Sequence, residues 1–316
     1  MADEQKISNT TEEVKKNSVI AKFARLIVLG GAALIVFVIF FVRFMVTESK
    51  NNTYYAPDIV IMGDSIFAYA LFGPSDSTVA GYLEKKMNVT VADASFGGTC
   101  MSYIDKDGRL DMSNDAYCMA ALTQAIVAQD FRYQDNSDIR LTATDYFEER
   151  LEMLKSIDFS QVDILIMDYL LNDYQIAVPV SCGSDKYDEY TYEGAMRSVV
   201  TQLKDKYPEL RIIVVAPVKS WYTDDSIPSD EMDLGGGTVD AYIECQKMIA
   251  EELGVEWISL YDIYDEFVAE NPDMIVDENG ESISMIKFFT DDQVHPRIVT
   301  RELIADRLCE YLTNGE

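Results

Sequence analysis

Five short apolar segments, rich in β-branched residues, recur along the chain with helical patterns between them. They are "DIVIM" (58–62), "VTVAD" (89–93), "DILIMD" (163–168), "RIIVVAP" (211–217) and "VEWISL" (255–260). Continuous apolar character over so few residues is typical of strands buried on both faces, as in parallel sheets. The sequence therefore predicts a five-stranded parallel sheet.

Amphipathic segments lie between and after these strands and predict the helices that connect them. They are "STVAGYLEKKM" (77–87), "TDYFEERLEMLKSI" (144–157), "TYEGAMRSVVTQLKDKYP" (191–208), "TVDAYIECQKMIAEELG" (238–254) and "RELIADRLCEYL" (301–312). Thr238 is suited to cap the fourth helix, and Gly254 to end it. Alternating strands and helices with short crossovers predict one doubly wound, three-layer α/β sandwich.

One segment near the N-terminus is apolar enough to cross a membrane. "LIVLGGAALIVFVIFFV" (26–42) carries no charge, and its continuation through "FMV" reaches about the 20 residues that a bilayer requires. No small-x-small cleavage motif follows, which disfavours a cleavable signal peptide. A transmembrane signal anchor is therefore predicted over residues 26–46.

Basic residues flank this segment unequally. Lys15, Lys16, Lys22 and Arg25 precede it, whereas only Arg43 and Lys50 follow closely. Because positive charge favours the cytoplasmic side, the N-terminus is predicted to be cytoplasmic. The expected organisation is a cytoplasmic tail (1–25), the anchor (26–46), a linker (47–57) and an extracytoplasmic globular domain (58–316), in a single-pass protein of the cell membrane.

Charge and cysteine content exclude or disfavour several functions. The net charge of −29, without a cluster of Lys and Arg in the globular region, argues against nucleic acid as a partner. The five cysteines show no C-x-x-C spacing, so a zinc or redox site has little support. Buried free thiols are favoured, and one disulfide stays open as an alternative for an exported domain.

The residues that follow the first two strands are candidates for a functional site, because ligands of such folds bind beyond the carboxyl ends of the strands. Gly63-Asp64-Ser65 follows the first strand. A serine there gains from the backbone N–H groups of a helix start, as a nucleophile or only as a cap. Gly97 and Gly98 follow the second strand, where they form a simple turn or direct N–H groups at an oxyanion.

The third strand and the C-terminal region supply the other candidates. Asn172 and Asp173 follow the third strand, and the Asn172 carboxamide is either a neutral oxyanion donor or part of a turn. His295 is the only histidine, and Asp292 lies three residues before it. That spacing lets the carboxylate reach Nδ1 and leaves Nε2 free as a general base.

These four motifs, in this order, resemble the blocks of the SGNH or GDSL hydrolase superfamily. The blocks are G-D-S at Gly63 to Ser65, the glycine at Gly97, N-D at Asn172 and Asp173, and D-x-x-H at Asp292 to His295. The resemblance covers nearly all of the region after Asp58. Together with "DYLLNDYQIAVP" it is similar to membrane-anchored bacterial members. One departure is Leu170, at a position where the family usually has glycine.

The resemblance implies a flavodoxin-like SGNH fold and a serine esterase. Ser65 would be the nucleophile, His295 the general base and Asp292 its partner, with the oxyanion bound by the N–H groups of Ser65 and Gly97 and by the side chain of Asn172. It implies no metal and no cofactor. The expected substrate is an O-acyl ester, for example an acetyl ester, of a carbohydrate or another small molecule.

Two alternative functions remain open, and three long segments are expected to border the site. The acyl group could pass to a cell-surface polymer instead of water, or the domain could be a non-catalytic binding or assembly protein. Segments 101–157, 175–189 and 219–237 exceed ordinary loop length and are expected to form the walls of the cleft.

Overall fold

The computed structural model describes residues 55–68, 77–106, 114–137, 146–181, 183–222, 227–277 and 279–315. The predicted tail (1–25), the predicted membrane anchor (26–46) and residues 47–54 of the linker lie outside this part of the chain. None of the helices within the described ranges is both long and apolar enough to cross a bilayer. The account below concerns the unit Tyr54–Glu316.

A parallel sheet of five strands forms the centre of this unit, in the order β2-β1-β3-β4-β7. The strands are β1 (Ile59–Gly63), β2 (Val91–Asp93), β3 (Ile164–Asp168), β4 (Arg211–Ala216) and β7 (Glu256–Ser259). Each strand matches its predicted segment to within two residues at either end, so the five-stranded parallel sheet is confirmed. A separate antiparallel pair joins β5 (Trp221–Tyr222) to β6 (Ile227–Pro228).

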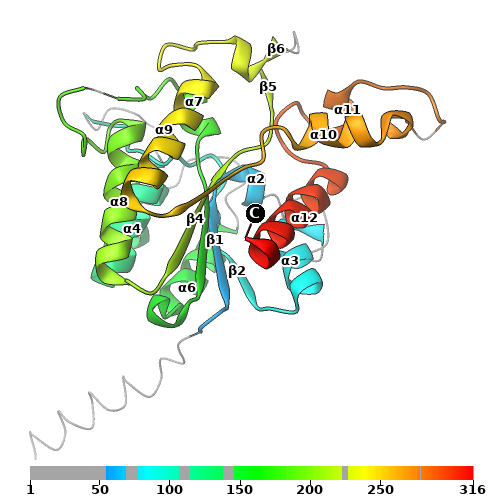
Figure 1. Cartoon of the computed structure of the whole chain (residues 1–316). Coiled ribbons are helices and arrows are strands. Elements are labelled where there is room, and N and C mark those ends of the chain that lie inside the picture. The colour runs from blue at the N-terminus through cyan, green and yellow to red at the C-terminus, as the bar shows by residue number, and fades with distance from the viewer. Residues whose placement is uncertain are drawn as a thin grey trace, which may run out of the picture. The chain divides into compact units, whose positions relative to one another are not determined.

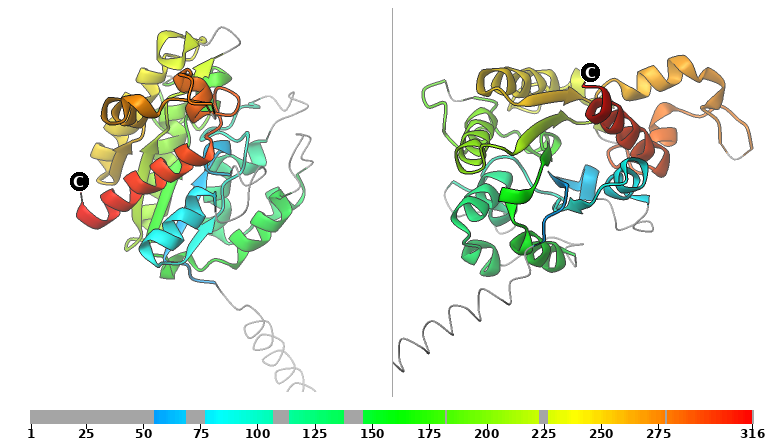
Figure 2. Two further views of the ribbon diagram at one scale, coloured as in Figure 1. Left: turned by 90° about the vertical axis from the view of Figure 1, so that its right-hand side faces the viewer. Right: turned by 60° about the horizontal axis from the view of Figure 1, so that its bottom comes forward.

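Helices cover both faces of the sheet (Figure 1). In the described residues they are α2 (Ser65–Ala68), α3 (Val79–Met87), α4 (Met119–Ala128), α5 (Arg132–Asp135), α6 (Phe147–Ser156), α7 (Leu171–Gln175), α8 (Tyr192–Lys206), α9 (Val239–Leu253), α10 (Ile263–Glu270), α11 (Met285–Phe289) and α12 (Ile298–Asn314). Short 3₁₀ turns are Asp115–Tyr117, Phe159–Gln161, Ser229–Glu231 and Pro272–Met274. Helices α4, α8 and α9 pack in sequence on one face, and α3 packs against α12 on the other, as both views of Figure 2 show.

The predicted ends of α9 are confirmed in detail. The Thr238 side chain accepts a hydrogen bond from the Ala241 N–H at 3.3 Å. Gly254 follows the last turn with φ of 63°, in the left-handed region that glycine adopts without steric cost. Between them the helix buries Tyr242, Cys245 and Ile249 against the core.

One expectation about the cleft walls holds for only part of its segment. The central part of segment 101–157 is the helix α4, most of which is buried and which packs against α8. The sequence "MAALTQAIVA" is apolar on nearly every side and therefore lacks an amphipathic pattern. Of its residues only Gln124 and Ala128 are exposed, so the broad polar face that marks an amphipathic helix is missing.

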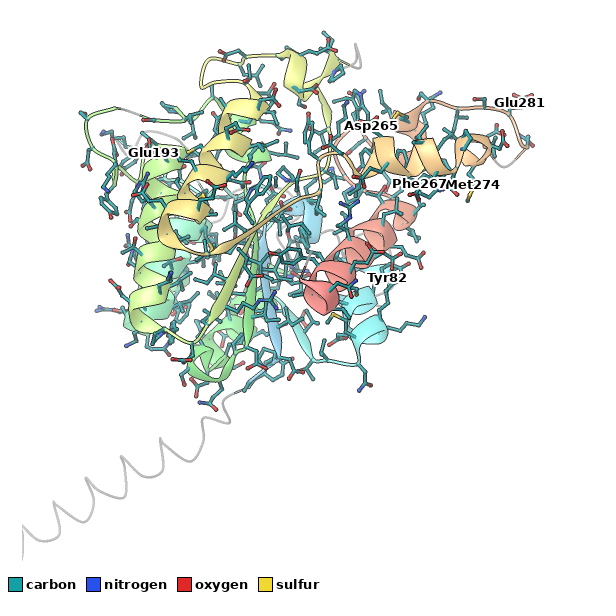
Figure 3. The ribbon with its side chains drawn as sticks, viewed as in Figure 1. Tyr82, Glu193, Asp265, Phe267, Met274 and Glu281 are labelled. Atoms are coloured by element: carbon teal, nitrogen blue, oxygen red, sulfur yellow. The ribbon has the colours of Figure 1, made fainter. Side chains whose placement is uncertain are left out.

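An arm formed by α10 and α11 extends beyond the end of the sheet. Figure 3 shows Phe267, Met274 and Glu281 spaced along it. Phe267 anchors the arm, since its ring centroid lies 5.9 Å from Phe288 and 5.7 Å from Phe289. Such aromatic contacts add to the area that the rings bury. The arm leads directly into the loop that carries Asp292 and His295.

The cysteines fit the prediction of free thiols. Cys100, Cys118 and Cys245 are free and buried, and Cys309 is free and half-buried. Cys182 lies outside the described residues.

Candidate active site

The strand order creates a switch point between β1 and β3. From β1 the chain moves outward to β2 and then returns across β1 to β3, after which the strands proceed in the other direction. Connections diverge at such a point and leave a crevice beyond the carboxyl ends of the strands. Ser65 follows β1 and Asn172 follows β3, so both candidates lie at this crevice.

Ser65 is the first residue of α2, directly after the turn that ends β1. Gly63 is the last residue of β1, directly before that turn, where an added Cβ would meet the Asp168 carbonyl oxygen at 3.0 Å. A larger residue would therefore push the turn away from β3. The half-buried Ser65 places its Oγ 2.9 Å from Nε2 of His295, which is 230 positions away in the sequence.

Asp292 holds the other nitrogen of the same imidazole ring. Its Oδ2 lies 2.6 Å from His295 Nδ1, and its Oδ1 accepts the His295 backbone N–H at 2.8 Å. The three side chains thus form a continuous chain from carboxylate to imidazole to hydroxyl. This arrangement matches the geometry of an activated serine nucleophile.

The loop that carries Asp292 and His295 is closed by its own backbone. The Asp291 N–H donates to the His295 carbonyl at 2.9 Å, and Gln293 takes a φ of 81° between them. The Trp221 N–H binds the Gln293 carbonyl at 3.0 Å and so connects the loop to β5. These hydrogen bonds fix the backbone of the loop and thereby position the residue that carries the imidazole.

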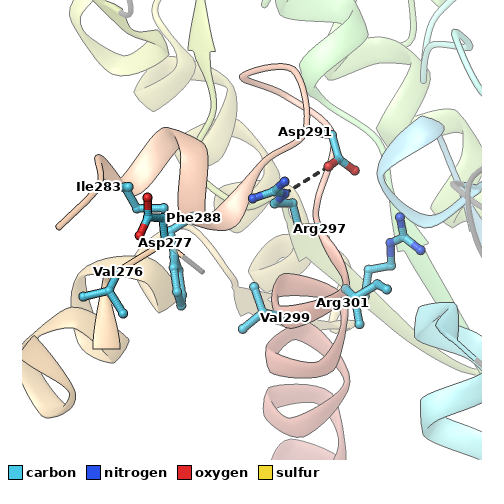
Figure 4. Close-up of a pocket in the computed structure, with 9 residues that line it drawn as sticks. Val276, Asp277, Ile283, Phe288, Asp291, Arg297, Val299 and Arg301 are labelled. Carbon is cyan, nitrogen blue, oxygen red and sulfur yellow. Dashed lines mark hydrogen bonds and ion pairs between the residues drawn. The ribbon is translucent and has the colours of Figure 1, made fainter. Parts of the chain in front are cut away.

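A cavity of about 680 Å³ lies on the arm beside this loop (Figure 4). Asp291 and Arg297, which pair at 3.1 Å, form part of its lining. Apolar residues of the arm complete it, among them Ile283 and Phe288. The ion pair supports the base of the loop, and neither partner touches Ser65 in the contacts of the described residues.

The electrostatic state of Asp292 suits its contact with the ring. Partial burial opposes ionisation, but hydrogen bonds from the backbone and ring of His295 outweigh it and hold the pKa of Asp292 below its ordinary value. An ionised Asp292 accepts hydrogen bonds only, so it favours the tautomer with the proton on Nδ1. Nε2 is then an acceptor toward the Ser65 hydroxyl.

Asn172 lies where predicted, but its carboxamide N–H groups are engaged within the protein. Nδ2 donates to Asp64 Oδ2 at 3.1 Å and to the Thr99 carbonyl at 2.9 Å. An amide nitrogen carries two protons, so both are used. Leu170, which replaces the family glycine just before this turn, is buried with φ of −173°, a value open to any residue.

Gly97 lies beside the nucleophile, and its N–H is also occupied. The Gly97 N–H donates to the hydroxyl of Tyr146 at 2.7 Å. Tyr146 precedes α6, 49 positions later, and the predicted helix start there does not indicate its place at the site. Like Thr99, it touches a predicted donor although it was not a predicted site residue.

Asp173, the second residue of the N-D block, connects two loops beneath the site. Its carboxylate accepts the Met101 N–H at 2.8 Å and both the N–H and the hydroxyl of Ser102, at 3.1 and 2.6 Å. The side chain is fully buried, and burial raises its pKa to about 6 despite these bonds. Its contacts fix the chain that follows the predicted oxyanion glycine.

Two of the segments expected to wall the cleft form a cavity together. It has a volume of about 620 Å³ and is lined by Tyr103, Ile176, Tyr190 and their neighbours. The two tyrosine rings lie 5.7 Å apart, and the Lys106 ammonium lies 5.2 Å from the centroid of Tyr190. Asn172 belongs to α7, and Ile176 directly follows the last residue of that helix, so the cavity begins next to the element that carries Asn172.

A group of buried carboxyls lies under Ser65. Burial and the negative charge of Asp173 raise the pKa of Asp64 to about 7, although the Ile66 N–H opposes the rise. Asp168, adjacent on β3, has no hydrogen-bond partner for either oxygen among the described residues. Burial and the charge of Asp64 hold the pKa of Asp168 well above its ordinary value. No group of side chains in the described ranges has the composition of a metal site.

These carboxyls should make folding stability depend on pH. The folded state keeps a proton on Asp64 up to about pH 7, whereas the unfolded chain loses it near its ordinary pKa of 3.8. The free energy of unfolding should therefore fall as pH rises through this window, with up to about 1.4 kcal/mol per pH unit from this group. In Asp64→Asn, urea unfolding at pH 4.5, 5.5 and 6.5 should show a flatter dependence.

The matched control for this measurement is Asp291→Asn. Asp291 is exposed and paired with Arg297, so its removal should leave the slope of the parent protein. An undiminished slope in Asp64→Asn would contradict the assignment of a retained proton to this carboxyl.

Comparisons with known proteins bear on the fold. No protein-family model matches the sequence, and no curated protein does. Among solved structures, a protein from Lactobacillus plantarum is 17% identical, with 83% of this chain and 100% of that chain covered and a TM-score of 0.53. A protein described as a possible lipase from Chitinophaga pinensis is 14% identical, covering 82% and 99%, with a TM-score of 0.51.

Likeness at this level of identity concerns the fold. It extends over 100% and 99% of the two solved structures. The chain therefore shares the fold of these two solved structures, one of which is described as a possible lipase.

Proposed function

We propose that this protein is a serine esterase that hydrolyses O-acyl esters. The observation that carries the proposal is the continuous contact of Asp292 with His295 at 2.6 Å and of His295 with Ser65 at 2.9 Å. A serine that only caps a helix has no need of a contact with an imidazole, and a histidine that only packs in the core has no need of a contact with a carboxylate. His295, the single histidine of the chain, contacts both Ser65 and Asp292.

The reaction follows from these contacts. Ser65 Oγ attacks the ester carbonyl carbon while His295 Nε2 takes the hydroxyl proton, and negative charge forms on the carbonyl oxygen. As the C–O bond to the alcohol breaks, His295 returns the proton to the leaving oxygen. Water then attacks the acyl-serine with the same base, and the carboxylic acid and free Ser65 are released.

The class of substrate is part of the proposal. A carbohydrate that carries an O-acyl group, such as acetyl, suits the cavity with Tyr103 and Tyr190, because sugar rings pack against aromatic faces and bind polar groups at their edges. The same acyl-serine would permit transfer to a polymer hydroxyl. Hydrolysis is proposed because no residue of the site in the described ranges selects such an acceptor over water.

The proposed location is the outer face of a cell membrane. Residues 26–46 would span the bilayer as a single helix with residues 1–25 in the cytoplasm, which the apolar run and the preceding basic residues support. A protease added to intact cells should then remove the domain that begins near residue 58, and should leave it intact if the domain lies inside.

The test of the function uses a fluorophosphonate, which reacts covalently with activated serine hydroxyls. The purified protein should be labelled on Ser65 alone, as located by peptide mass spectrometry. It should also release acid from short-chain 4-nitrophenyl esters and from acetylated oligosaccharides. Parallel reactions with and without an unacetylated oligosaccharide separate transfer from hydrolysis. A Ser65 that stays unlabelled in folded protein would refute the esterase and favour a binding role.

A further inference from the structure

Two of the three predicted oxyanion donors already donate hydrogen bonds to other groups of the protein. Gly97 donates its N–H to Tyr146, and Asn172 uses both N–H groups on Asp64 and Thr99. A tetrahedral intermediate on Ser65 needs donors at the oxygen that becomes charged. The Ser65 N–H, at the start of α2, has no partner within its own helix and is one such donor.

Tyr146 borders the same space as the nucleophile. A methyl group added to Gly97 would lie 2.7 Å from the Tyr146 hydroxyl and 3.5 Å from Ser65 Cβ. The phenol oxygen of Tyr146 and Cβ of Ser65 therefore flank one small volume, next to the Gly97 N–H, which is one of the two backbone donors that the resemblance implies. In the reaction proposed above, this volume would receive the oxygen of a carbonyl bound to Ser65.

The phenol ring is held in position from both sides. The Arg150 guanidinium carbon lies 4.7 Å from the centroid of the Tyr146 ring, and the edge of Phe147 meets it with a centroid distance of 5.1 Å. Arg150 is itself fixed, because its Nη1 donates to Asp93 Oδ1 at 2.9 Å and to the Ser95 carbonyl at 2.6 Å. Donors immobilised in advance stabilise a transition state without a cost of reorganisation.

The hydroxyl of Tyr146 still has its own proton to donate. It accepts the Gly97 N–H, and its proton has no acceptor among the described residues. Burial raises the pKa of Tyr146 above its ordinary value, although the Gly97 N–H and Arg150 oppose the rise, so the hydroxyl is protonated at neutral pH. A hydroxyl that accepts one hydrogen bond becomes a stronger donor of the next.

We propose that Tyr146 is a catalytic residue whose hydroxyl donates a hydrogen bond to the oxyanion. The Gly97 N–H, which donates to the same hydroxyl, makes it a stronger donor. The proposal rests on the esterase function. Its proton stays on the phenol oxygen throughout, since the proton of Ser65 moves to His295 and then to the leaving alcohol. The oxyanion site thus consists of the Ser65 N–H and the Tyr146 O–H.

The opposite role makes a different prediction. In the opposite role, the Tyr146 hydroxyl only accepts the Gly97 N–H in the free protein and gives way to substrate. Loss of the hydroxyl would then leave the Gly97 N–H free to bind the oxyanion, and turnover would be equal or higher. The variant Tyr146→Phe separates the two roles, because it keeps the ring between Arg150 and Phe147 and removes one oxygen.

The experiment compares the parent protein with Tyr146→Phe on a 4-nitrophenyl acetate substrate. A donor to the oxyanion acts in the transition state, so kcat should fall about 100-fold while KM changes by no more than a few-fold. Binding of an aryl trifluoromethyl ketone, which forms a tetrahedral adduct with the serine, should weaken by about the same factor. Thermal melting should show that the variant is folded.

Tyr117→Phe is the matched control. Tyr117 packs in the same aromatic cluster, 5.1 Å from Phe147, but its hydroxyl points to the Gln134 carbonyl at 3.3 Å. Its kcat and ketone affinity should equal those of the parent. Unchanged or increased kcat in Tyr146→Phe, or equal ketone affinity, overturns the proposal while the esterase stands. A parent protein that neither turns over ester nor binds the ketone overturns both.

Discussion

Replacement of Ser65 by alanine is expected to lower ester turnover by a factor on the order of 10⁴ or more. The variant removes the hydroxyl that contacts His295 Nε2, so no acyl-enzyme forms and the binding site and its donors alone remain. The measurement is kcat on 4-nitrophenyl acetate, with fluorophosphonate labelling in parallel. Both signals should disappear together.

The folded state should tolerate this change. Ser65 is half-buried and lies at the first position of a four-residue helix, so the loss of its oxygen leaves no buried partner other than the imidazole. Ser160→Ala is a suitable control, because Ser160 is exposed in the turn Phe159–Gln161 and its hydroxyl donates to Asp158. Turnover in Ser65→Ala that matched the control would show that another group carries the reaction.

Asp292→Asn is the second large effect, with an expected loss in kcat on the order of 10² to 10⁴. The Asp292 Oδ1 accepts the backbone N–H groups of His295 and Val294, at 2.8 and 3.2 Å. An asparagine would keep its oxygen there, because its amide group cannot accept those bonds. The NH₂ group would then face Nδ1 of His295.

The consequence is a change of tautomer. A donor opposite Nδ1 makes that nitrogen an acceptor and moves the proton to Nε2, where it faces the Ser65 hydroxyl. The base can no longer take the proton of the nucleophile. Loop geometry and thermal stability should change little, since the two backbone hydrogen bonds remain.

The neighbouring carboxylate provides the control for Asp292. The Asp291 side chain pairs with Arg297 at the surface at 3.1 Å, whereas the carboxylate on His295 Nδ1 is that of Asp292. Asp291→Asn should keep kcat within a few-fold of the parent, as expected for an exposed ion pair. Equal losses in the two variants would mean that the loop responds to charge in general and that Asp292 has no specific role in orienting the ring.

Local features of the site were predictable where the interaction spans few residues. Asp292 and His295 are three positions apart on one loop, so their contact follows from spacing alone. The positions of Ser65 and Asn172 after strands were also predictable, since continuous apolar runs identify buried strands and parallel strands end at one edge. The buried helix α4 was missed because an all-apolar segment carries no periodicity.

Contacts between distant segments could not be obtained in this way. The residues around Tyr146 do not indicate that its hydroxyl accepts the Gly97 N–H. Nor does the sequence indicate that the Asn172 side chain donates to Asp64 and to the Thr99 carbonyl. The retained proton on Asp64 depends on burial and on the nearby Asp173, which no linear pattern reports.

The amino-acid sequence by itself determined the strands, the helices that connect them and the residue types available for chemistry, because periodicity and turn preferences act over a few neighbouring positions. Only the tertiary structure decided which of those groups touch. Ser65 and His295 are 230 positions apart, and the folding of the sheet around its switch point brings them to 2.9 Å. A hydrogen bond forms only when donor and acceptor are about 3 Å apart, so the contacts on which the chemistry depends exist only in the folded chain.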